Sequence, residues 1–234
     1  MGRGGLKSGK GKILWYPSNC ERHSRIVMIE VAEMKAIVNV NQSWGIGKDG
    51  GLLAYIPEDM KLFRNATKGG TVIMGRKTLE SFPGGKPLKG RLNIVLTRDA
   101  DKLRRSMERQ READGREAGT GLSGVQPKDV DIPQVLELDC EGTRFLALNS
   151  TKALLGMDAA LLRDAFVIGG AQIYRELLPY CDECLVTVND SPREADTFFP
   201  DLDAPSDWKR VQESEEKTYE DIHYKFTVYR RTAE

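Results

Sequence analysis

Short apolar runs that pass directly into helical patterns are the feature that most constrains the fold of this chain. TVIMG at 71–75 leads into RKTLESF, and AFVIGG at 165–170 leads into AQIYRELLP. Fully apolar runs this short predict strands buried on both faces, and strands that alternate with helices predict a mostly parallel sheet. We therefore expect an α/β fold whose ligands bind beyond the carboxyl ends of the strands.

The other segments complete a single domain around one central sheet. Further strands are predicted in KAIVNVN (35–41), LNIVLTRD (92–99), TRFLALN (143–149) and CLVTVND (184–190), and helices in IPEDMKLFRNAT (56–67) and STKALLGMDAALLRD (150–164). WKRVQESEEK (208–217) and HYKFTVYRR (223–231) alternate as an antiparallel hairpin would. We expect a three-layer domain with a mixed, mostly parallel sheet of eight strands, helices on both faces and a C-terminal antiparallel hairpin.

Charge and composition exclude several classes of partner. Lys+Arg and Asp+Glu both number 35 in the 234 residues, so the chain lacks the overall basic field that holds nucleic acid through its phosphates. No run approaches the ~18 apolar residues that a membrane span requires. We expect a cytoplasmic monomer that binds neither nucleic acid nor membrane.

Two segments differ in composition from the rest. Residues 1–33 lack the continuous apolar stretch of a signal peptide, and the pattern changes at Met34 to that of a strand. We expect the domain to span 34–234, with 1–33 as a disordered tail or a gene-start artefact. Residues 100–134 are charged and glycine-rich with few large apolar groups, which predicts a solvated insertion, helical at its start if ordered.

The four cysteines do not predict a metal site. Cys181 and Cys184 form one C-x-x-C pair, which lacks the further Cys or His ligands of a zinc site and the surroundings of a redox site. Ordinary thiols at the start of a strand are the favoured interpretation.

Groups suited to phosphate follow three of the predicted strands. Gly169 and Gly170 let a backbone approach a pyrophosphate at a helix N-terminus, although a simple tight turn has the same glycines. Arg76 and Lys77 oppose the helix dipole where they stand, which a phosphate between them would explain and a solvated basic turn also allows. Arg98 ends the strand expected beside MGRKT and is placed to bind the same phosphate.

LLAYIPEDMKLFR at 52–64 puts a carboxylate, Asp59, where the apolar pattern of a short helix points inward beside Met60 and Phe63. From spacing alone, the favoured interpretation is a carboxylate at a helix start that interacts with the dipole. The alternative is a buried catalytic acid.

Taken together, the motifs resemble dihydrofolate reductase. The resemblance is carried by AIVNVNQSWGIGKDG, LLAYIPEDMKLFRNAT, VIMGRKTLESFPGGKPLKGRLNIVLTRD, FVIGGAQIYRELLP and DTFFPD, in the order of the family and roughly its spacing. It runs from Met34 to about Arg231, interrupted at 100–134. It implies reduction of 7,8-dihydrofolate to tetrahydrofolate by a hydride from NADPH, and inhibition by antifolates.

The resemblance also implies roles for individual residues. Asp59 corresponds to the acid that hydrogen-bonds the pterin and aids protonation of N5 before the hydride reaches C6, and Thr187 to the threonine that bonds this acid. Desolvation would raise the pKa of such a carboxylate so that it holds a proton near neutrality. Arg91 corresponds to the arginine that binds the glutamate α-carboxylate. The implied substrate-binding residues are Val38, Asn39, Met60, Phe63, Arg91 and Ile168.

The cofactor site implied by the resemblance surrounds the glycines and basic residues already named. Ile46 and Gly47 would begin a mobile lid over the nicotinamide, and the arginines would select NADPH over NADH through its 2′-phosphate. The implied cofactor-binding residues are Ile46, Gly47, Gly75, Arg76, Lys77, Thr78, Thr97, Arg98, Gly169, Gly170, Ala171, Gln172 and Ile173.

Two positions depart from the family pattern, which usually has tryptophan at Ala54 and a small alanine at Asn39. We expect Tyr55, Asn39 or water to fill the space beside Ala54, water being preferred, and expect antifolates to bind more weakly. Two rival functions stay open. One is the reductase of riboflavin synthesis, which has the same fold but no use for Asp59 or Arg91. The other is a non-catalytic protein that retains the nucleotide site.

Overall fold

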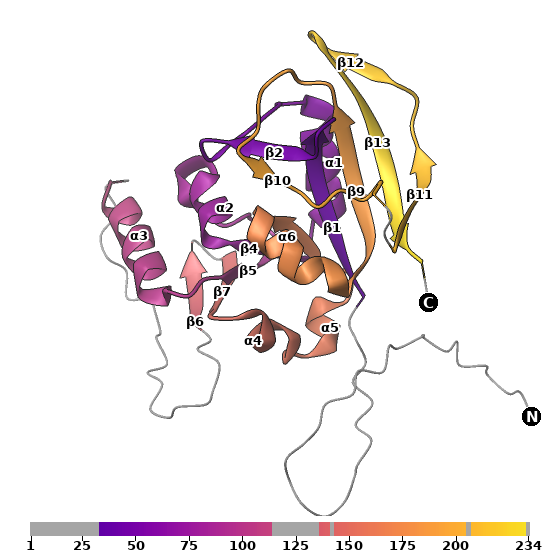
Figure 1. Ribbon diagram of the computed structural model, residues 1–234. Coiled ribbons are helices and arrows are strands. Elements are labelled where there is room, and N and C mark those ends of the chain that lie inside the picture. Colours follow the sequence, from indigo (N-terminus) through magenta and orange to yellow (C-terminus); the bar gives the residue numbers. More distant parts are fainter. Residues whose placement is uncertain (1–32, 114–135, 141–142, 205–206, 233–234) are drawn as a thin grey trace, which may run out of the picture.

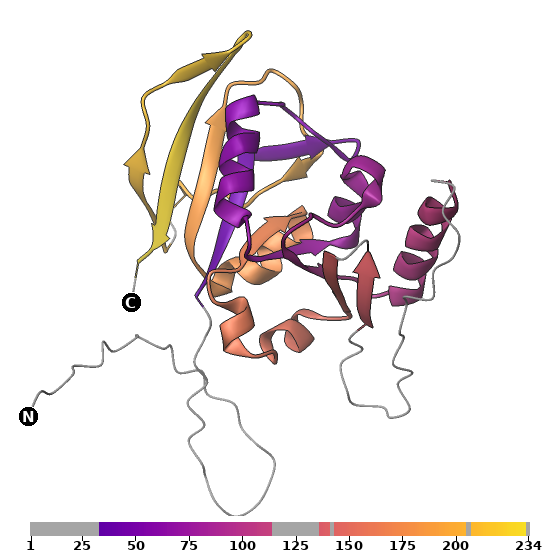
Figure 2. The same cartoon turned by 180° about the vertical axis from the view of Figure 1, so that it is seen from behind.

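The computed structural model describes residues 33–113, 136–140, 143–204 and 207–232. Within these residues the chain forms a three-layer α/β domain, in which a ten-stranded mixed sheet carries helices on both faces (Figure 1, Figure 2). The predicted fold class is confirmed. The expectations for residues 1–32 and 114–135 concern parts of the chain outside the described residues.

The central sheet has the strand order β11-β13-β9-β1-β8-β4-β5-β7-β6, with β12 paired to β13. Pairing is parallel between β1 and both β8 and β9, between β4 and both β5 and β8, and between β5 and β7. The strands are β1 (Met34–Asn41), β4 (Thr71–Gly75), β5 (Leu92–Leu96), β6 (Leu136–Cys140), β7 (Thr143–Leu148), β8 (Phe166–Gly169), β9 (Cys181–Asn189), β11 (Trp208–Glu213), β12 (Lys217–Tyr219) and β13 (Ile222–Arg231).

Six parallel strands therefore end at one edge of the sheet, which is where an open α/β sheet binds ligands. The C-terminal hairpin is also present, because β11 and β13 pair antiparallel. Two strands, β6 and β12, add to the eight that the sequence predicts. β12 is three residues long and β6 borders the charged segment, so neither has an apolar run of its own.

A second sheet of three strands replaces the loop expected between 42 and 51. It consists of β10 (Thr197–Phe198), β2 (Gly45–Lys48) and β3 (Gly51–Leu52). Gly45 is required for this packing, since a Cβ atom there would lie 2.3 Å from the Cβ atom of Ala195. The backbone N–H of Phe199 donates to the carbonyl of Trp44 at 2.8 Å and fastens the sheet to the following segment.

Helices cover the two faces of the central sheet in two groups (Figure 1). One face carries α1 (Pro57–Thr67), α2 (Arg76–Ser81) and α3 (Ala100–Ala113), and the other carries α4 (Thr151–Leu155), α5 (Ala159–Leu162) and α6 (Ala171–Leu177). Short 3₁₀ turns, η1 (Pro83–Gly85) and η2 (Leu178–Tyr180), follow α2 and α6. None of the described helices is long and apolar enough to cross a membrane.

Strand alternation divides the core between the faces. On β1, Ile37 belongs to the cluster under α1 and α2, whereas Val38 and Val40 belong to the cluster under α4 and α6. This alternation decides which side chains of β1 lie on the same face of the sheet as α1.

Two expectations about helices are corrected. The segment 100–134 is not solvated throughout, because α3 buries Leu103 to 1% exposure against the cluster that contains Leu79. The helix expected over 150–164 is interrupted after Gly156, and a second helix starts where Asp158 accepts a hydrogen bond from the N–H of Ala160 at 2.9 Å.

Cys181 and Cys184 are buried free thiols on β9. Burial raises the pKa of Cys181 to about 12, so the thiol stays protonated and unreactive. Both behave as the small apolar side chains that the sequence favoured.

Candidate active site

Asp59 is a buried carboxylate in the first turn of α1. The helix starts at Pro57, where the missing backbone N–H of proline leaves no hydrogen bond unmade. Two residues later, the side chain of Asp59 faces β1 and β9. Its side chain is 7% exposed. Burial raises its pKa, and hydrogen bonds from Thr187 and Asn39 oppose that rise. The pKa of this carboxyl group is therefore higher than that of an ordinary aspartate, which suits a group that relays a proton.

Both oxygens of Asp59 accept hydrogen bonds from strand residues. The hydroxyl of Thr187 donates to Oδ1 at 2.6 Å, and Nδ2 of Asn39 donates to Oδ2 at 3.0 Å. Asn39 in turn accepts a bond at 2.7 Å from Nδ2 of Asn189. Sequence reasoning missed Asn189. Its position two residues after Thr187 on the same strand was the available signal, because such residues share a face.

Apolar side chains lie on the same face of the sheet as this carboxylate. Ile37, Phe63 and Ile168 belong to one cluster on the α1 face, and Met60 lies on the same helix as Phe63. The assignment of Val38 to substrate binding is wrong for its side chain, which packs on the opposite face of the sheet. Ile37 takes that place, as a period of two from Asn39 would have indicated.

Tyr224 of the C-terminal strand β13 fills the space beside Ala54. Ala54 forms a buried cluster with Ile56 and Tyr224 of β13, whereas Tyr55, one expected filler, is 64% exposed. The Tyr224 hydroxyl donates to Oε2 of Glu58 at 3.1 Å, and burial raises the tyrosine pKa. No local sequence pattern points to this contact, which joins residues 170 positions apart.

Arg91, which precedes β5 in the sequence, contacts the C-terminal end of α1. Its Nε donates to the hydroxyl of Thr67 at 2.8 Å, and its terminal nitrogens donate to the carbonyls of Lys89 at 3.0 Å and Arg64 at 3.4 Å. All three acceptors are neutral, and partial burial lowers the guanidinium pKa. The group is fixed in orientation while keeping its charge, which suits recognition of a carboxylate.

Two strand-to-helix turns meet at the carboxyl edge of the sheet. A Cβ atom on Gly75, before α2, would lie 3.1 Å from Cγ1 of Ile173 on α6. Cβ atoms on Gly169 or Gly170 would lie 3.4 Å from the hydroxyl of Thr78. The peptide bond between these two glycines is cis. Glycine is favoured at Gly75 by this close contact and at Gly169 by its φ of 120°, a conformation that other residues rarely adopt.

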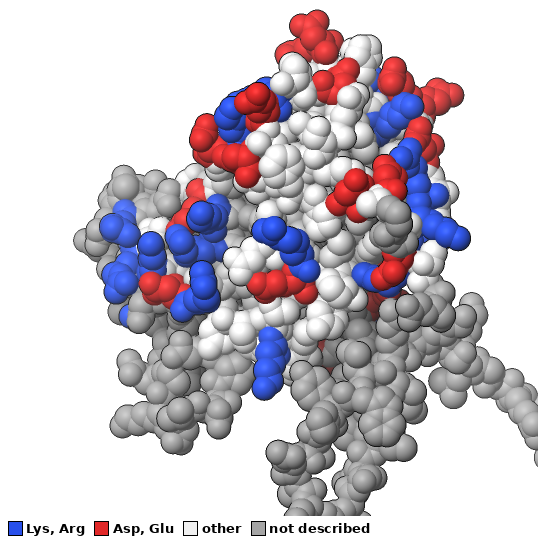
Figure 3. All heavy atoms as spheres, viewed as in Figure 1, with Lys and Arg blue, Asp and Glu red and all other residues white. Residues whose placement is uncertain are grey.

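Basic groups gather beside these turns. Figure 3 shows lysine and arginine side chains clustered over α2 and α3 at the left of the molecule. Nη1 of Arg76 pairs with Oε1 of Glu80 at 2.5 Å. Hydrogen bonds from Thr151 and Gln172, the latter through Nε2 at 2.8 Å, lower the pKa of Glu176, and the charge of Arg98 lowers it further. A phosphate would therefore compete with Glu80 for Arg76, and Lys77 is exposed beside it.

The remaining predicted cofactor residues occupy the same edge. Ile46 and Gly47 lie on β2, where the carbonyl of Gly47 accepts from the N–H of Asp196 at 3.0 Å. Thr97 follows β5, is 8% exposed, and donates to the carbonyl of Asp99 at 3.2 Å. Ala171 is the first residue of α6.

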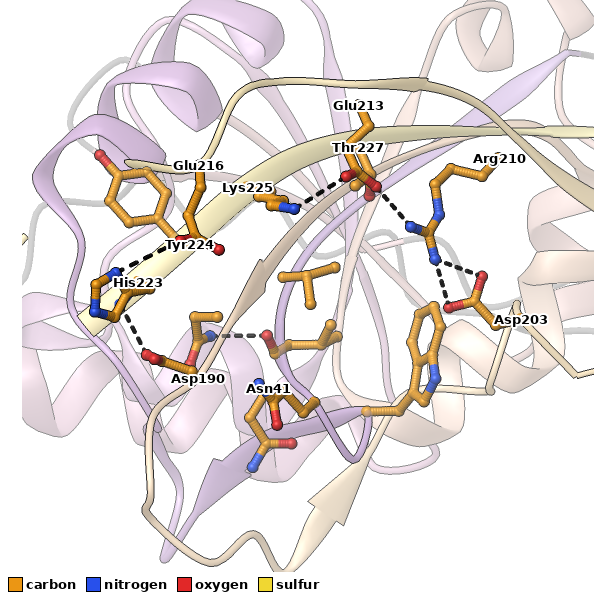
Figure 4. A pocket seen from close by; sticks show the side chains of 15 residues that line it. Asn41, Asp190, Asp203, Arg210, Glu213, Glu216, His223, Tyr224, Lys225 and Thr227 are labelled. Atoms are coloured by element: carbon orange, nitrogen blue, oxygen red, sulfur yellow. Dashed lines mark hydrogen bonds and ion pairs between the residues drawn. The ribbon is translucent and has the colours of Figure 1, made fainter. Parts of the chain in front are cut away.

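A separate cavity of about 410 Å³ lies between β13, β11 and the ends of β1 and β9 (Figure 4). Val40 and Val188 in its lining belong to the core face opposite Asp59. Its charged groups pair with one another: Arg210 binds Asp203 at 2.9 Å and Glu213 at 2.6 Å, as Figure 4 shows. Asp59 does not line this cavity, but Asn189 and Tyr224, which contact Asn39 and Ala54, do.

Comparisons with known proteins agree with this geometry. A family model described as dihydrofolate reductase matches residues 33–117 and 135–231. The dihydrofolate reductase of Bacillus subtilis (strain 168) is 33% identical over 189 residues, covering 80% of this chain and 87% of that protein. A solved structure of dihydrofolate reductase from Enterococcus faecalis, complexed with NADP(H) and RAB-propyl, is similar with a TM-score of 0.59 and 26% identity. It is matched over 86% of this chain and 97% of its own.

Longer proteins match over part of their length. The bifunctional dihydrofolate reductase-thymidylate synthases of Glycine max and Daucus carota are 32% and 36% identical, over 84% of this chain. The chain spans about a third of the length of each, since 33% of either protein is covered.

Proposed function

The chain belongs to the dihydrofolate reductase family, and on that premise we propose that it reduces 7,8-dihydrofolate to 5,6,7,8-tetrahydrofolate with NADPH. The observation that carries the proposal is the buried Asp59 carboxylate, bonded by Thr187 and Asn39 beside the open carboxyl edge of the sheet. A single acid with a raised pKa in an apolar pocket fits protonation of a ring nitrogen before hydride transfer.

In this proposal the protein residues bind, orient and protonate the substrate. Asp59 accepts two N–H groups of the pterin and aids protonation of N5, while Thr187 holds the carboxylate in place. Ile37, Phe63 and Ile168 exclude water from the ring by apolar contact. Met60 contacts the benzoyl region, and Arg91, which its neutral partners orient, binds the glutamate carboxylate.

The turns after β4, β5 and β8 are proposed to hold the cofactor. NADPH, when bound, supplies the hydride that reaches C6. The close packing of Gly75, Gly169 and Gly170 leaves backbone N–H groups accessible to its pyrophosphate. Arg76, after leaving Glu80, and Arg98 bind the 2′-phosphate. The residues proposed to line this site are Ile46, Gly47, Gly75, Arg76, Lys77, Thr78, Thr97, Arg98, Gly169, Gly170, Ala171, Gln172 and Ile173.

The rival functions are less well supported. A ribosylated pyrimidine lacks the glutamate tail that Arg91 fits, and the family match names dihydrofolate reductase. A non-catalytic protein would have no need of an acid with a raised pKa buried beside the pterin site.

Loss of NADPH absorbance on addition of dihydrofolate is the decisive test. Turnover with dihydrofolate supports the proposal. NADPH binding without turnover would identify a non-catalytic homologue, and turnover only with a ribosylated pyrimidine would identify the riboflavin-pathway reductase. A trimethoprim-like diaminopyrimidine should inhibit the reaction, because its cation pairs with Asp59.

We also propose a cytoplasmic monomer. The free thiols Cys181 and Cys184 fit a reducing compartment, and helices of the same chain cover both faces of the sheet. We propose that the domain spans 34–234, with 1–33 as an extension and 100–134 as an insertion. The family match omits 118–134, which supports an insertion in that part of the segment. Light scattering of the purified chain tests the monomer.

A further inference from the structure

Asn39 donates a hydrogen bond to Asp59, and Asn189 determines which end of the Asn39 amide faces the carboxylate. Asn189, 2% exposed, accepts the backbone N–H of Ser191 on its Oδ1 at 2.9 Å. Its Nδ2 donates to the carbonyl of Val40 at 2.8 Å. These two backbone groups fix the amide of Asn189, because reversing it would place oxygen against oxygen and N–H against N–H.

The fixed amide of Asn189 determines the orientation of Asn39. Nδ2 of Asn189 faces Asn39 at 2.7 Å and can only donate, so Asn39 must present its Oδ1 there. Nδ2 of Asn39 is then left to face Oδ2 of Asp59 at 3.0 Å. Asp59 consequently meets an N–H donor at this oxygen, never a carbonyl.

We propose that Asn39 is a positioning residue that holds Asp59 in its ionised form and directs the free lone pairs of the carboxylate towards the bound heterocycle. An N–H donor stabilises the anion, and a carboxylic O–H at Oδ2 would find no acceptor on Asn39 because Asn189 prevents the amide from reversing. This inference rests on the proposed function for the identity of the ligand, not for the hydrogen bonds.

The lone pairs of Asp59 show what the ligand must offer. A carboxylate has about four acceptor sites. Thr187 uses one on Oδ1 and Asn39 one on Oδ2. One site on each oxygen is left, which fits a heterocycle with two parallel N–H donors. Asn39 thereby favours ligands that supply two N–H donors to the two remaining lone pairs.

The groups around Asp59 allow its titration to be followed alone. Glu58, next to it on α1, points away and binds Lys217 at 2.7 Å, which lowers the Glu58 pKa. Tyr174 of α6 and Tyr224 of β13 interact electrostatically with Asp59, and burial raises the pKa of both tyrosines. β1 and β9 present uncharged Asn39, Thr187 and Asn189 to it.

The experiment is a titration of the Asp59 carboxyl carbon by ¹³C NMR in the ligand-free protein, compared with the variants Asn39→Leu and Asn39→Ala. Leu keeps the volume and Ala removes it, and neither donates. Both should move the midpoint upward by about one pH unit, the size of one lost hydrogen bond to a charged group. An unchanged midpoint in both variants would overturn the proposal.

Two further variants separate positioning from general damage. Asn189→Leu does not touch Asp59 but should also move the midpoint upward, since Asn39 can then reverse; no shift would overturn the role of Asn189. Thr227→Val removes a buried bond of 2.8 Å to the carbonyl of Val186 and should lower stability without moving the midpoint. A shift in this control equal to that of Asn39→Leu would overturn the inference.

The titration needs no turnover, so its outcome is independent of the proposed function. If the protein reduces dihydrofolate, the pH at which hydride transfer is half-maximal should move upward in Asn39→Leu with the NMR midpoint. If it does not, the reaction assignment fails while the NMR result still decides the role of Asn39.

Discussion

Replacing Asp59 by Asn should stabilise the fold while removing most activity. Asn matches the carboxylate in shape, and its oxygen accepts from Nδ2 of Asn39, as Oδ2 of Asp59 does. Its nitrogen can donate to Oγ1 of Thr187, but the hydroxyl hydrogen of Thr187 then loses the acceptor that Asp59 provides. The substitution therefore removes the buried charge, and this gain exceeds the cost of one lost hydrogen-bond acceptor at neutral pH. At neutral pH, loss of the acid should slow hydride transfer by ~10²–10⁴-fold, with partial recovery at low pH.

The size of the stabilisation follows from the raised pKa of Asp59. Below the unfolded pKa of 3.8 the acid is protonated in both states, so the only difference between variant and parent there is the pH-independent cost of the acceptor that Thr187 loses. As pH rises through the folded pKa, the parent loses about 1.4 kcal/mol for every unit of the difference. For a chain of this length each unit corresponds to roughly 3–6 °C in Tm at neutral pH.

Thermal unfolding from pH 3 to pH 8 measures this directly, together with turnover at each pH. The Tm difference between Asp59→Asn and the parent should grow with pH, and NADPH affinity should stay the same. A variant that is less stable than the parent at neutral pH, or a difference independent of pH, would refute the claim that burial dominates the pKa of Asp59.

Three other groups of substitutions test separate parts of the structure. Gln at Arg76 or Arg98 should raise the KM for NADPH more than the KM for NADH, with a loss of at most ~1.5–3 kcal/mol of binding free energy per contact. An unchanged preference for NADPH over NADH would place the 2′-phosphate elsewhere. Leu103→Ala should lower the free energy of unfolding in urea by ~2–5 kcal/mol, whereas a solvated segment would show almost no change. Ala54→Trp should cost ~1–3 kcal/mol by overpacking, and adding Tyr224→Ala should recover part of it; additive losses would contradict the packing described.

The parts of the site that depend on local pattern could be predicted from the sequence. The strands before Gly75 and Gly169 are continuous apolar runs, and each is followed at once by a helix, so the two turns were placed at the correct edge of the sheet. The inward position of Asp59 was visible because it breaks the apolar stripe of its helix.

Contacts between distant strands were not predictable in the same way. Tyr224 reaches Ala54 only because β13 pairs with β9 in one register, in which Tyr224 lies opposite Asn189. In the charged helix α3 only Leu103 and Met107 are large apolar residues, and both contact the cluster that contains Leu79. Two apolar residues four positions apart are a weak periodic signal in a segment so rich in charge. Val38 was included among the substrate-binding residues because the whole motif was carried over, although strand alternation places its side chain on the face opposite Asn39.

The outer strand β11 bears on how the protein behaves at high concentration. A sheet edge exposes unpaired N–H and C=O groups that can recruit other chains into aggregates. Lys209, Arg210 and Glu213 lie along this strand, and its register with β13 shifts between Arg210 and Gln212. Charge and a bulge are two features that interrupt edge-to-edge pairing. Mutagenesis intended to promote crystallisation should therefore leave the charged residues of this strand unchanged, because removing their charges would favour aggregation.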